Sequence, residues 1–254
     1  MSYQETIAQW NNFTLLEPTL KEELKSLEGN EEALKDAFFA PLEFGTAGMR
    51  GILGVGINRM NIYTVRQATE GLARLMEAKG KKKKKRGVAI AYDSRHQSPE
   101  FAMEAAKTLG AHGISAFVFE SLRPTPELSF AVRHMNALTG IMITASHNPA
   151  DYNGYKVYGD DGGQMTPDDA DALTEYVRAI ENPLTIQVGD EAELKAAGLI
   201  KMLGEEVDAA YLELVKTVTV DPALVHEMSK EMKLVFTPLH GTGQMMGERA
   251  LKNA

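Results

Sequence analysis

One short segment of the sequence brings a hydroxyl, an imidazole and an ammonium group together. TASHNPADYNGYK, residues 144–156, contains Ser146, His147 and Lys156 and follows the apolar run LTGIMI. A serine hydroxyl is a poor nucleophile unless a base, a metal or a lowered pKa activates it. Neighbouring side chains on an extended backbone point in opposite directions, so Ser146 and His147 are not expected to form a catalytic pair. The Gly-x-Ser-x-Gly turn of α/β hydrolases is also missing, which disfavours a serine hydrolase.

Phosphoryl transfer is the chemistry that uses all three groups. A phosphoryl group on Ser146, exposed at a strand end, would be stabilised by turn amides and nearby cations. Lys156 follows the turn-forming residues YNGY and could return to the same place as an acid, a base or a phosphate partner. Spacing alone leaves a second interpretation open, in which the segment is a polar surface turn without chemistry.

Two other segments have the composition of shaped loops. LEFGTAGMRGILGVG, residues 42–56, contains Arg50 and five glycines, which are too many for a helix or an ordinary strand. YDSRHQS, residues 92–98, contains Asp93 and Arg95 and lies at the end of the apolar run VAIAY. Ligands in open α/β sheets bind outside the carboxyl ends of strands, and we expect both YDSRHQS and ASHNP at that edge.

The elements that must position these loops alternate between helix and strand. Helical patterns cover residues 3–39, in two or three pieces, and residues 62–76. Residues 87–120 have the pattern of strand, loop, helix and strand, a βαβ unit in which Ser98 is expected to cap the helix. The strand LTGIMIT follows, and after a short hairpin Thr166 is expected to cap another helix.

This alternation indicates an α/β domain over residues 1–200. Beyond it, residues 204–230 show two helical patterns, and residues 233–254 have the pattern of a strand, a glycine-bearing turn and a helix. One strand, one loop and one helix cannot make a domain core. We therefore predict that residues 201–254 are the incomplete beginning of a second domain and that the chain is an N-terminal fragment.

Composition and charge exclude several classes of protein. The 254 residues carry a formal net charge of −8 and include no cysteine, so disulfide bonds and thiolate zinc sites are excluded. The N-terminus lacks the pattern of a signal peptide, and no run of eighteen apolar residues occurs. The basic run KGKKKKKRG, residues 79–87, has no interleaved aromatic residues and is typical of a solvated helix end. We expect a cytoplasmic protein that binds neither nucleic acid nor membranes.

Taken together, the motifs resemble those of one enzyme family. TASHNPADYNGYKVY resembles the phosphoserine loop of the α-D-phosphohexomutases, the phosphoglucomutase and phosphomannomutase superfamily, and FGTAGMRG resembles their glycine-rich arginine loop. The order and separation of these motifs match, and the helical residues before them resemble the longer branch that includes the phosphopentomutase-like enzymes. The resemblance implies a three-layer α/β/α domain with a mixed, mostly parallel sheet, followed by the start of a second α/β domain.

The resemblance also implies roles for individual residues. Ser146 would carry a phosphoryl group, give it to a sugar monophosphate and recover the other phosphate from the resulting bisphosphate. Arg50 would contact the transferring phosphate, and Lys156 would act as a general acid or base. His147 would orient the sugar or the phosphate, and Asn148 would shape the loop.

Some of the candidate residues also have structural interpretations. Arg50 could pair with a carboxylate and brace the glycine-rich loop, and Asp93 and Arg95 are expected to support the phosphoserine loop as a pair. His240, in TPLHGTG, is expected in a loop between domains. The acidic stretch DDGGQMTPDDAD lacks the spacing of an EF-hand calcium loop, so we expect a solvated turn and a helix start there.

The largest departure from the family concerns its metal. Full members bind Mg²⁺ through a D-G-D-x-D-R type loop in their second domain, and this pattern does not occur in the chain. Ser146 would therefore belong to the metal site only through its phosphate. The resemblance implies glucose, mannose or pentose phosphates as substrates and a sugar bisphosphate as primer, while the chain alone is expected to have little or no mutase activity. The alternative is a stand-alone sugar-phosphate-binding or regulatory module without turnover.

Overall fold

The computed structural model describes residues 2–45 and 48–254, and its centre is a six-stranded sheet with the order β1-β5-β4-β2-β3-β6. Strands β4, β2, β3 and β6 are parallel, whereas β5 is antiparallel to both β1 and β4. This arrangement confirms the predicted mixed, mostly parallel sheet. The strands are β1 Met49–Ile52, β2 Val88–Tyr92, β3 Ala116–Phe119, β4 Thr139–Ile143, β5 Tyr152–Tyr158 and β6 Ile200–Leu203.

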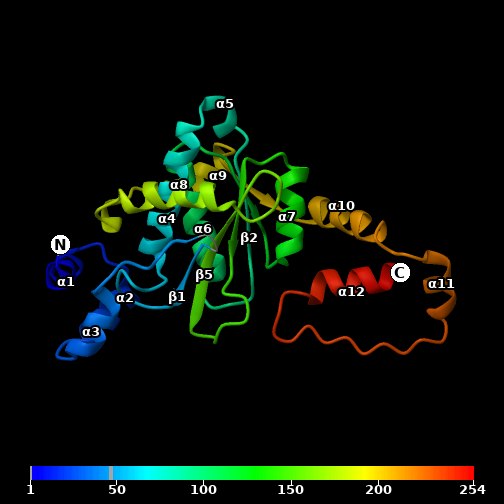
Figure 1. Ribbon diagram of the computed structural model, residues 1–254, viewed down its shortest axis with the longest axis horizontal. Coiled ribbons are helices and arrows are strands. Elements are labelled where there is room, and N and C mark those ends of the chain that lie inside the picture. The colour runs from blue at the N-terminus through cyan, green and yellow to red at the C-terminus, as the bar shows by residue number, and fades with distance from the viewer. Residues whose placement is uncertain (1, 46–47) are drawn as a thin grey trace.

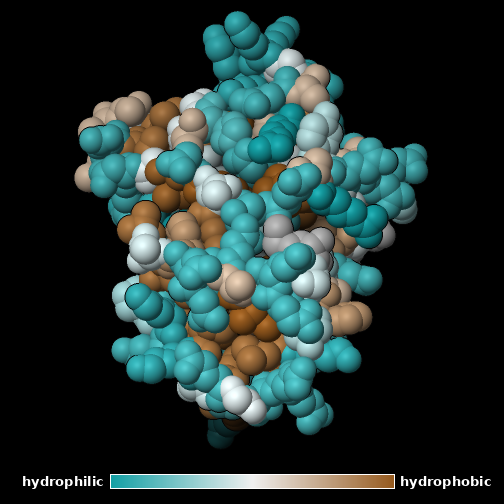
Figure 2. All heavy atoms as spheres, turned by 90° about the vertical axis from the view of Figure 1, so that its left-hand side faces the viewer, coloured by the Kyte–Doolittle hydropathy of each residue, from teal (hydrophilic) through white to brown (hydrophobic). Residues whose placement is uncertain are grey.

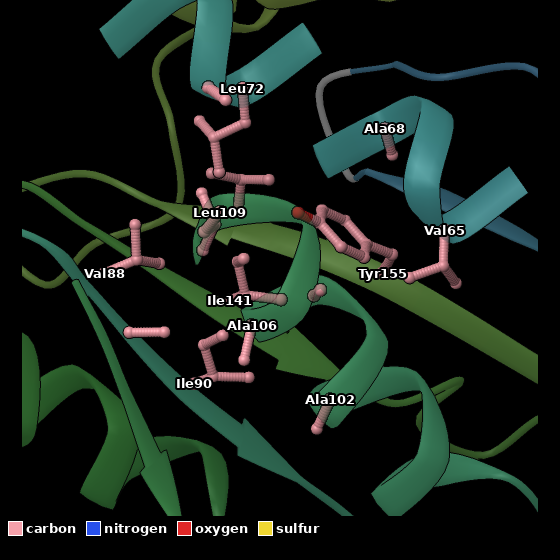
Figure 3. Close-up of a cluster of buried hydrophobic side chains, with 14 of the residues drawn as sticks. Val65, Ala68, Leu72, Val88, Ile90, Ala102, Ala106, Leu109, Ile141 and Tyr155 are labelled. Atoms are coloured by element: carbon pink, nitrogen blue, oxygen red, sulfur yellow. The ribbon is translucent and has the colours of Figure 1, made fainter. Parts of the chain in front are cut away.

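Helices cover both faces of the sheet and give the expected three layers (Figure 1). One face carries α4 (Ile62–Ala78), α6 (Ser98–Ala111), α8 (Pro167–Arg178) and α9 (Glu191–Ala196). The other face carries α7 (Thr125–His134) and α10 (Glu205–Lys216). The larger core lies between the first group and the sheet, and Figure 3 shows part of it. The labelled side chains come from α4, α6 and strands β2, β4 and β5: Val65, Ala68, Leu72, Val88, Ile90, Ala102, Ala106, Leu109, Ile141 and Tyr155.

Three short helices at the N-terminus confirm the predicted interrupted helical region. They are α1 (Tyr3–Asn12), α2 (Pro18–Ser26) and α3 (Glu31–Phe38), and they pack around Trp10 and Tyr63, together with the short 3-10 helix η1 (Pro183–Thr185). Figure 2 shows the side of the molecule toward the N-terminus, where hydrophobic side chains lie between hydrophilic ones. Glu23 of α2 accepts a 3.0 Å hydrogen bond from Val55 N, so these helices brace the glycine-rich segment.

The segment around Tyr158 forms the expected short hairpin. Its first strand is β5, which pairs with β1 and β4, and its return strand is a single antiparallel bridge between Tyr158 and Gln164. The turn is closed by hydrogen bonds from Gly159 N to Gly163 O at 2.8 Å and from Met165 N to Val157 O at 3.2 Å. The helix that follows, α8, begins as predicted, because the Thr166 side chain accepts from Asp169 N.

The C-terminal part contains α10, α11 (Pro222–Met228) and α12 (Gln244–Asn253), and residues 229–243 link α11 to α12 (Figure 1). The prediction of a strand at residues 233–236 is wrong. Val235 is 94% exposed, and no strand lies beside this segment in the part of the chain that the structure describes. An extended segment without a neighbour has no ladder of hydrogen bonds to hold it as a strand. The domain division after residue 200 stays a prediction, and β6 extends the sheet to Leu203.

The basic run forms the short helix α5 (Lys81–Lys84) and the turns around it. Lys84 pairs with Glu77 at 2.8 Å, Lys79 with Asp169 at 3.2 Å, and most of the lysines are exposed. Over residues 2–45 and 48–254, no helix combines the length and the apolarity needed to cross a membrane.

Candidate active site

Ser146 lies in the loop that follows β4, at the carboxyl edge of the parallel strands. Its backbone adopts the left-handed conformation, with φ of 56°, which is uncommon for a residue other than glycine. Both backbone polar groups of Ser146 are bound by side chains. Its N–H donates to Thr144 Oγ1 at 3.0 Å, and its carbonyl accepts from Arg95 Nη2 at 2.9 Å. The loop therefore holds an exposed hydroxyl on a constrained backbone.

His147 lies closer to Ser146 than we expected from the sequence. Its Nδ1 is 3.4 Å from Ser146 Oγ. The expectation that the two side chains diverge is wrong, because it assumed an extended backbone and Ser146 is left-handed. This distance is beyond the usual upper limit of about 3.2 Å for hydrogen bonds between nitrogen and oxygen, so the two side chains do not form a tight nucleophile–base pair.

Arg95 binds the serine loop, residues 144–152, through its guanidinium group. Nη1 donates to the carbonyls of Pro149 and Tyr152 at 2.7 and 3.0 Å. Nη2 donates to the carbonyls of Ser146 and Asn148 at 2.9 and 2.6 Å. Four carbonyls of one loop thus converge on a single planar fork of donors, a geometry that suits arginine and not lysine.

Asp93 anchors the neighbouring loop in turn. Its Oδ1 accepts from Arg95 N at 3.0 Å and from Ser98 Oγ at 2.8 Å, and its Oδ2 lies 3.4 Å from Arg95 Nε. The expectation that Ser98 caps α6 is wrong. Gln97 occupies the cap position without a side-chain cap bond, while the Ser98 hydroxyl turns inward to Asp93 and accepts from Asn153 Nδ2 at 2.9 Å. Burial of this polar network explains why the hydroxyl serves the loop and not the helix end.

Arg50 and Lys156 approach the loop from β1 and β5. Arg50 pairs with Gly154 in the sheet register, two residues from Lys156, so both side chains lie on the same face of the sheet. Arg50 Nη1 donates to Asn148 Oδ1 at 2.8 Å. Partial burial, and then the charge of Arg50, lower the pKa of Lys156, while Asp93 opposes this shift. A lysine with a lowered pKa is better suited to proton transfer.

Two glycines allow the backbones to meet at this point. A Cβ on Gly154 would lie 2.6 Å from Thr144 O and 2.9 Å from Met49 O, and one on Gly48 would lie 2.1 Å from Tyr155 O. Gly48 also has φ of 84°, in the region that favours glycine. The expected glycine-rich arginine loop is thus packed onto β5, although its residues 46–47 lie outside the described residues.

A cleft of about 650 Å³ opens over Ser146. Segments that follow β2 and β4 line it, and so does the segment 240–242, which the sequence placed between domains. The Ser94 hydroxyl donates to the His240 carbonyl at 3.3 Å and ties that segment to the cleft. Sequence reasoning missed Thr144, Ser94 and Thr125 as lining residues. Thr144 could have been found, because it lies between the apolar strand and the serine.

The residues present do not fit a divalent cation. In the described ranges, no group of three or more acidic or histidine side chains could hold a metal ion. Asp93 is the carboxylate on the cleft, and Arg95 and Ser98 already occupy its oxygens. The acidic stretch after β5 forms a turn, in which Asp161 Oδ1 accepts from Gly163 N, and the first turn of α8.

The sequence matches the family model described as phosphoglucomutase/phosphomannomutase, alpha/beta/alpha domain I, over residues 41–184. It is 40% identical over 214 residues to a phosphoglucomutase of Staphylococcus saprophyticus. The matched region covers 84% of this chain and 37% of the relative. It is 37% identical over 219 residues to the phosphoglucomutase of Staphylococcus aureus strain N315, covering 86% of this chain and 38% of that protein. The chain therefore spans little more than a third of the length of these curated relatives.

Solved structures show the same fold. A protein from Thermus thermophilus described as a putative phosphomannomutase superposes with a TM-score of 0.68 and 27% identity, over 84% of this chain and 43% of that one. Parafusin from Paramecium, described as a phosphoglucomutase, superposes with a TM-score of 0.62 over 83% of this chain and 41% of that one. Its 17% identity supports the fold alone.

Proposed function

This chain belongs to the phosphoglucomutase/phosphomannomutase family, and from that membership we propose that it is the phosphoserine-bearing domain of a phosphosugar mutase. Ser146 Oγ carries the phosphoryl group, and the substrates are sugar monophosphates such as glucose, mannose or pentose phosphates. The complete enzyme is an isomerase that moves a phosphoryl group between two carbons of the sugar. Because the chain spans about a third of its relatives, turnover belongs to the longer protein and the first phosphoryl transfer to this part.

The transfer is a displacement at phosphorus. The bond between phosphorus and Ser146 Oγ breaks while a sugar hydroxyl oxygen forms a new bond to the same phosphorus. The sugar hydroxyl gives its proton to the neutral form of Lys156, which the lowered pKa makes more abundant. The bisphosphate then turns over, its other phosphate moves to Ser146 Oγ, and Lys156 returns the proton to the leaving sugar oxygen. Catalysis of this kind is mostly positioning and charge neutralisation.

The observation that supports this proposal best is the meeting of Arg50 with the serine loop. Arg50 and Asn148 are 98 positions apart in the sequence, and their side chains are 2.8 Å apart. The guanidinium keeps further donors for an anion beside the loop that carries Ser146, and a planar donor fork suits a phosphoryl group. Ser146 and His147 line the cleft itself.

In this proposal, the metal site and much of the sugar recognition lie outside this chain, in the longer protein. The described residues do not by themselves fit Mg²⁺. We propose that Mg²⁺ is held mainly by residues of the longer protein, with Ser146 contributing through its phosphate, and that a sugar bisphosphate serves as primer.

Phosphorylation of Ser146 tests the proposal directly. The purified chain is incubated with glucose 1,6-bisphosphate and Mg²⁺, and intact mass with phosphopeptide mapping locates any added phosphate. We expect one phosphoryl group on Ser146 and none in Ser146→Ala. Ser229→Ala is the matched control, because that serine lies at the end of α11, and it should behave as the parent chain. Binding of glucose 1-phosphate without any phosphorylation of Ser146 would contradict the mutase assignment and favour a stand-alone binding module.

A turnover assay separates the domain from the complete enzyme. With glucose 1-phosphate, Mg²⁺ and the bisphosphate primer, we expect little or no glucose 6-phosphate from this chain alone. Sustained turnover by the isolated chain would contradict this division of labour.

A further inference from the structure

The backbone of Ser146 is held from both sides by side chains of other residues. It is one of three residues other than glycine with positive φ in the described part of the chain. Such a conformation persists only where the surroundings impose it, and it is common at functional sites. Here the N–H of Ser146 is taken by Thr144 Oγ1 at 3.0 Å and its carbonyl by Arg95 Nη2 at 2.9 Å.

Thr144 is itself fixed in the sheet. Its N–H donates to Gly154 O at 3.0 Å, which extends the pairing of β4 with β5, and the residue is 7% exposed. A β-branched side chain has few accessible rotamers, so its hydroxyl stays where the backbone puts it. The acceptor for the Ser146 amide is therefore part of the rigid sheet edge and not of the mobile end of a long side chain.

We infer that Thr144 is a positioning residue, whose hydroxyl locks Ser146 in the left-handed conformation that presents Ser146 Oγ to the cleft. The inference rests on the proposed function of Ser146 as the phosphoryl carrier. In-line transfer depends on the direction of the serine oxygen, and a displacement of about 1 Å can cost about 100-fold in rate.

The same hydrogen bond decides which groups can stabilise the phosphoryl charge. The Ser146 amide donates to Thr144 and is not available to a phosphate on its own side chain. The expected help from turn amides would therefore have to come from other amides of the loop. Arg50 and Lys156 add cationic side chains on one face of the sheet beside it.

Three substitutions at Thr144 test the inference. Thr144→Val keeps the shape and removes the acceptor, Thr144→Ala removes it with less bulk, and Thr144→Ser retains it. Thr108→Val is the matched control, since Thr108 is a buried threonine on α6 whose hydroxyl donates to Glu104 O. The first readout is NMR of the Ser146 amide. Hydrogen exchange measures its protection, and the three-bond coupling between its amide and α hydrogens reports φ.

We expect the Ser146 amide to exchange at least about 10-fold faster in Thr144→Val and Thr144→Ala, with a changed coupling. Thr144→Ser and Thr108→Val should match the parent chain. If Thr144→Val fails to fold, Thr144→Ala decides the outcome. Unchanged exchange and coupling in the folded variants would overturn the inference, whether or not Ser146 is ever phosphorylated.

The second readout is the rate at which glucose 1,6-bisphosphate phosphorylates Ser146. We expect a fall of about 10- to 100-fold in Thr144→Val, with unchanged affinity for the bisphosphate and recovery in Thr144→Ser. A parent chain that is never phosphorylated counts against the proposed function alone. A parent chain that is phosphorylated, with Thr144→Val equally fast, counts against the role of Thr144 alone.

Discussion

Arg123 and Asp208 form a buried two-point ion pair between the start of α7 and the first turns of α10. Arg123 Nε donates to Asp208 Oδ1 and Nη2 to Asp208 Oδ2, each at 2.8 Å, and the two residues are 1% and 2% exposed. Arg123 N also donates to Tyr92 O, next to Asp93 of the site. The pair thus links the second helical layer to the strand end that supports the serine loop.

Breaking this pair should destabilise the whole fold. Asp208→Asn removes the charge of the carboxylate that meets the buried guanidinium of Arg123 at two points, and loss of one partner of a buried pair costs about 3–5 kcal/mol. Urea unfolding followed by circular dichroism measures the change. Glu191→Gln is the control, because it removes only the surface pair with Lys195, and about 0.5 kcal/mol or less is expected. Equal effects of the two substitutions would contradict the importance of the buried pair.

Glu127 should make the stability depend on pH. It is fully buried beside this pair, and burial followed by contact with Asp208 raises its pKa from 4.5 to about 8. Between these two values the folded chain retains a proton that the unfolded chain releases. The free energy of unfolding therefore falls as the pH rises through this window, by up to about 1.4 kcal/mol per pH unit.

Glu127→Gln isolates this contribution. The variant cannot ionise at this position, so it should lose the decline between pH 4.5 and 8 and gain stability over the parent chain toward pH 8. Urea unfolding at about pH 5, 6, 7 and 8 gives the slopes, and groups that titrate in both proteins cancel in the comparison. Parallel slopes for the two proteins would show that Glu127 is already ionised in the folded state.

Lys156 should control the pH dependence of phosphoryl transfer. When glucose 1,6-bisphosphate phosphorylates Ser146, the leaving sugar oxygen needs a proton, which protonated Lys156 supplies. The rate should fall as the pH rises through the lowered pKa of Lys156, below the ordinary value of 10.5. Lys156→Met should slow the transfer by about 100-fold or more and abolish this fall in rate with rising pH. Lys201→Met, on β6, is the control and should change neither. A pH profile that survives in Lys156→Met would assign the proton to another group.

Gly154 should tolerate no side chain. Gly154→Ala places a methyl group 2.6 Å from Thr144 O and 2.9 Å from Met49 O, so the three strands must separate where Arg50 and the serine loop meet. We expect a loss of about 1–3 kcal/mol in stability and slower phosphorylation of Ser146. Gly243→Ala is the control, because the nearest atom to a Cβ there is Phe236 Cζ at 3.8 Å, an ordinary contact distance. Thermal unfolding and the phosphorylation assay measure both effects, and a Gly154→Ala chain with parental values in both would refute the argument.

Much of the fold could be predicted from the sequence because the signals are local. The periodicity of residues 62–76 predicts α4, and the cap at Thr166 predicts the start of α8. Predictions failed where a local signal competed with distant partners. Ser98 has the composition of a helix cap, yet its hydroxyl bonds Asp93, and residues 233–236 have the composition of a strand but no strand lies beside them in the described structure.

The sequence by itself determined which groups are available for chemistry: a serine after a buried strand, a lysine ten residues later, and an arginine in a glycine-rich segment about a hundred residues before them. Only the tertiary structure decided how they meet. It gave Ser146 its left-handed backbone, brought Arg50 within 2.8 Å of Asn148, and placed Arg95 under four carbonyls of one loop. The sequence determines the residue types and their local conformational preferences. The conformation of a loop and the pKa of Lys156 depend on groups that the sheet brings together from distant parts of the chain.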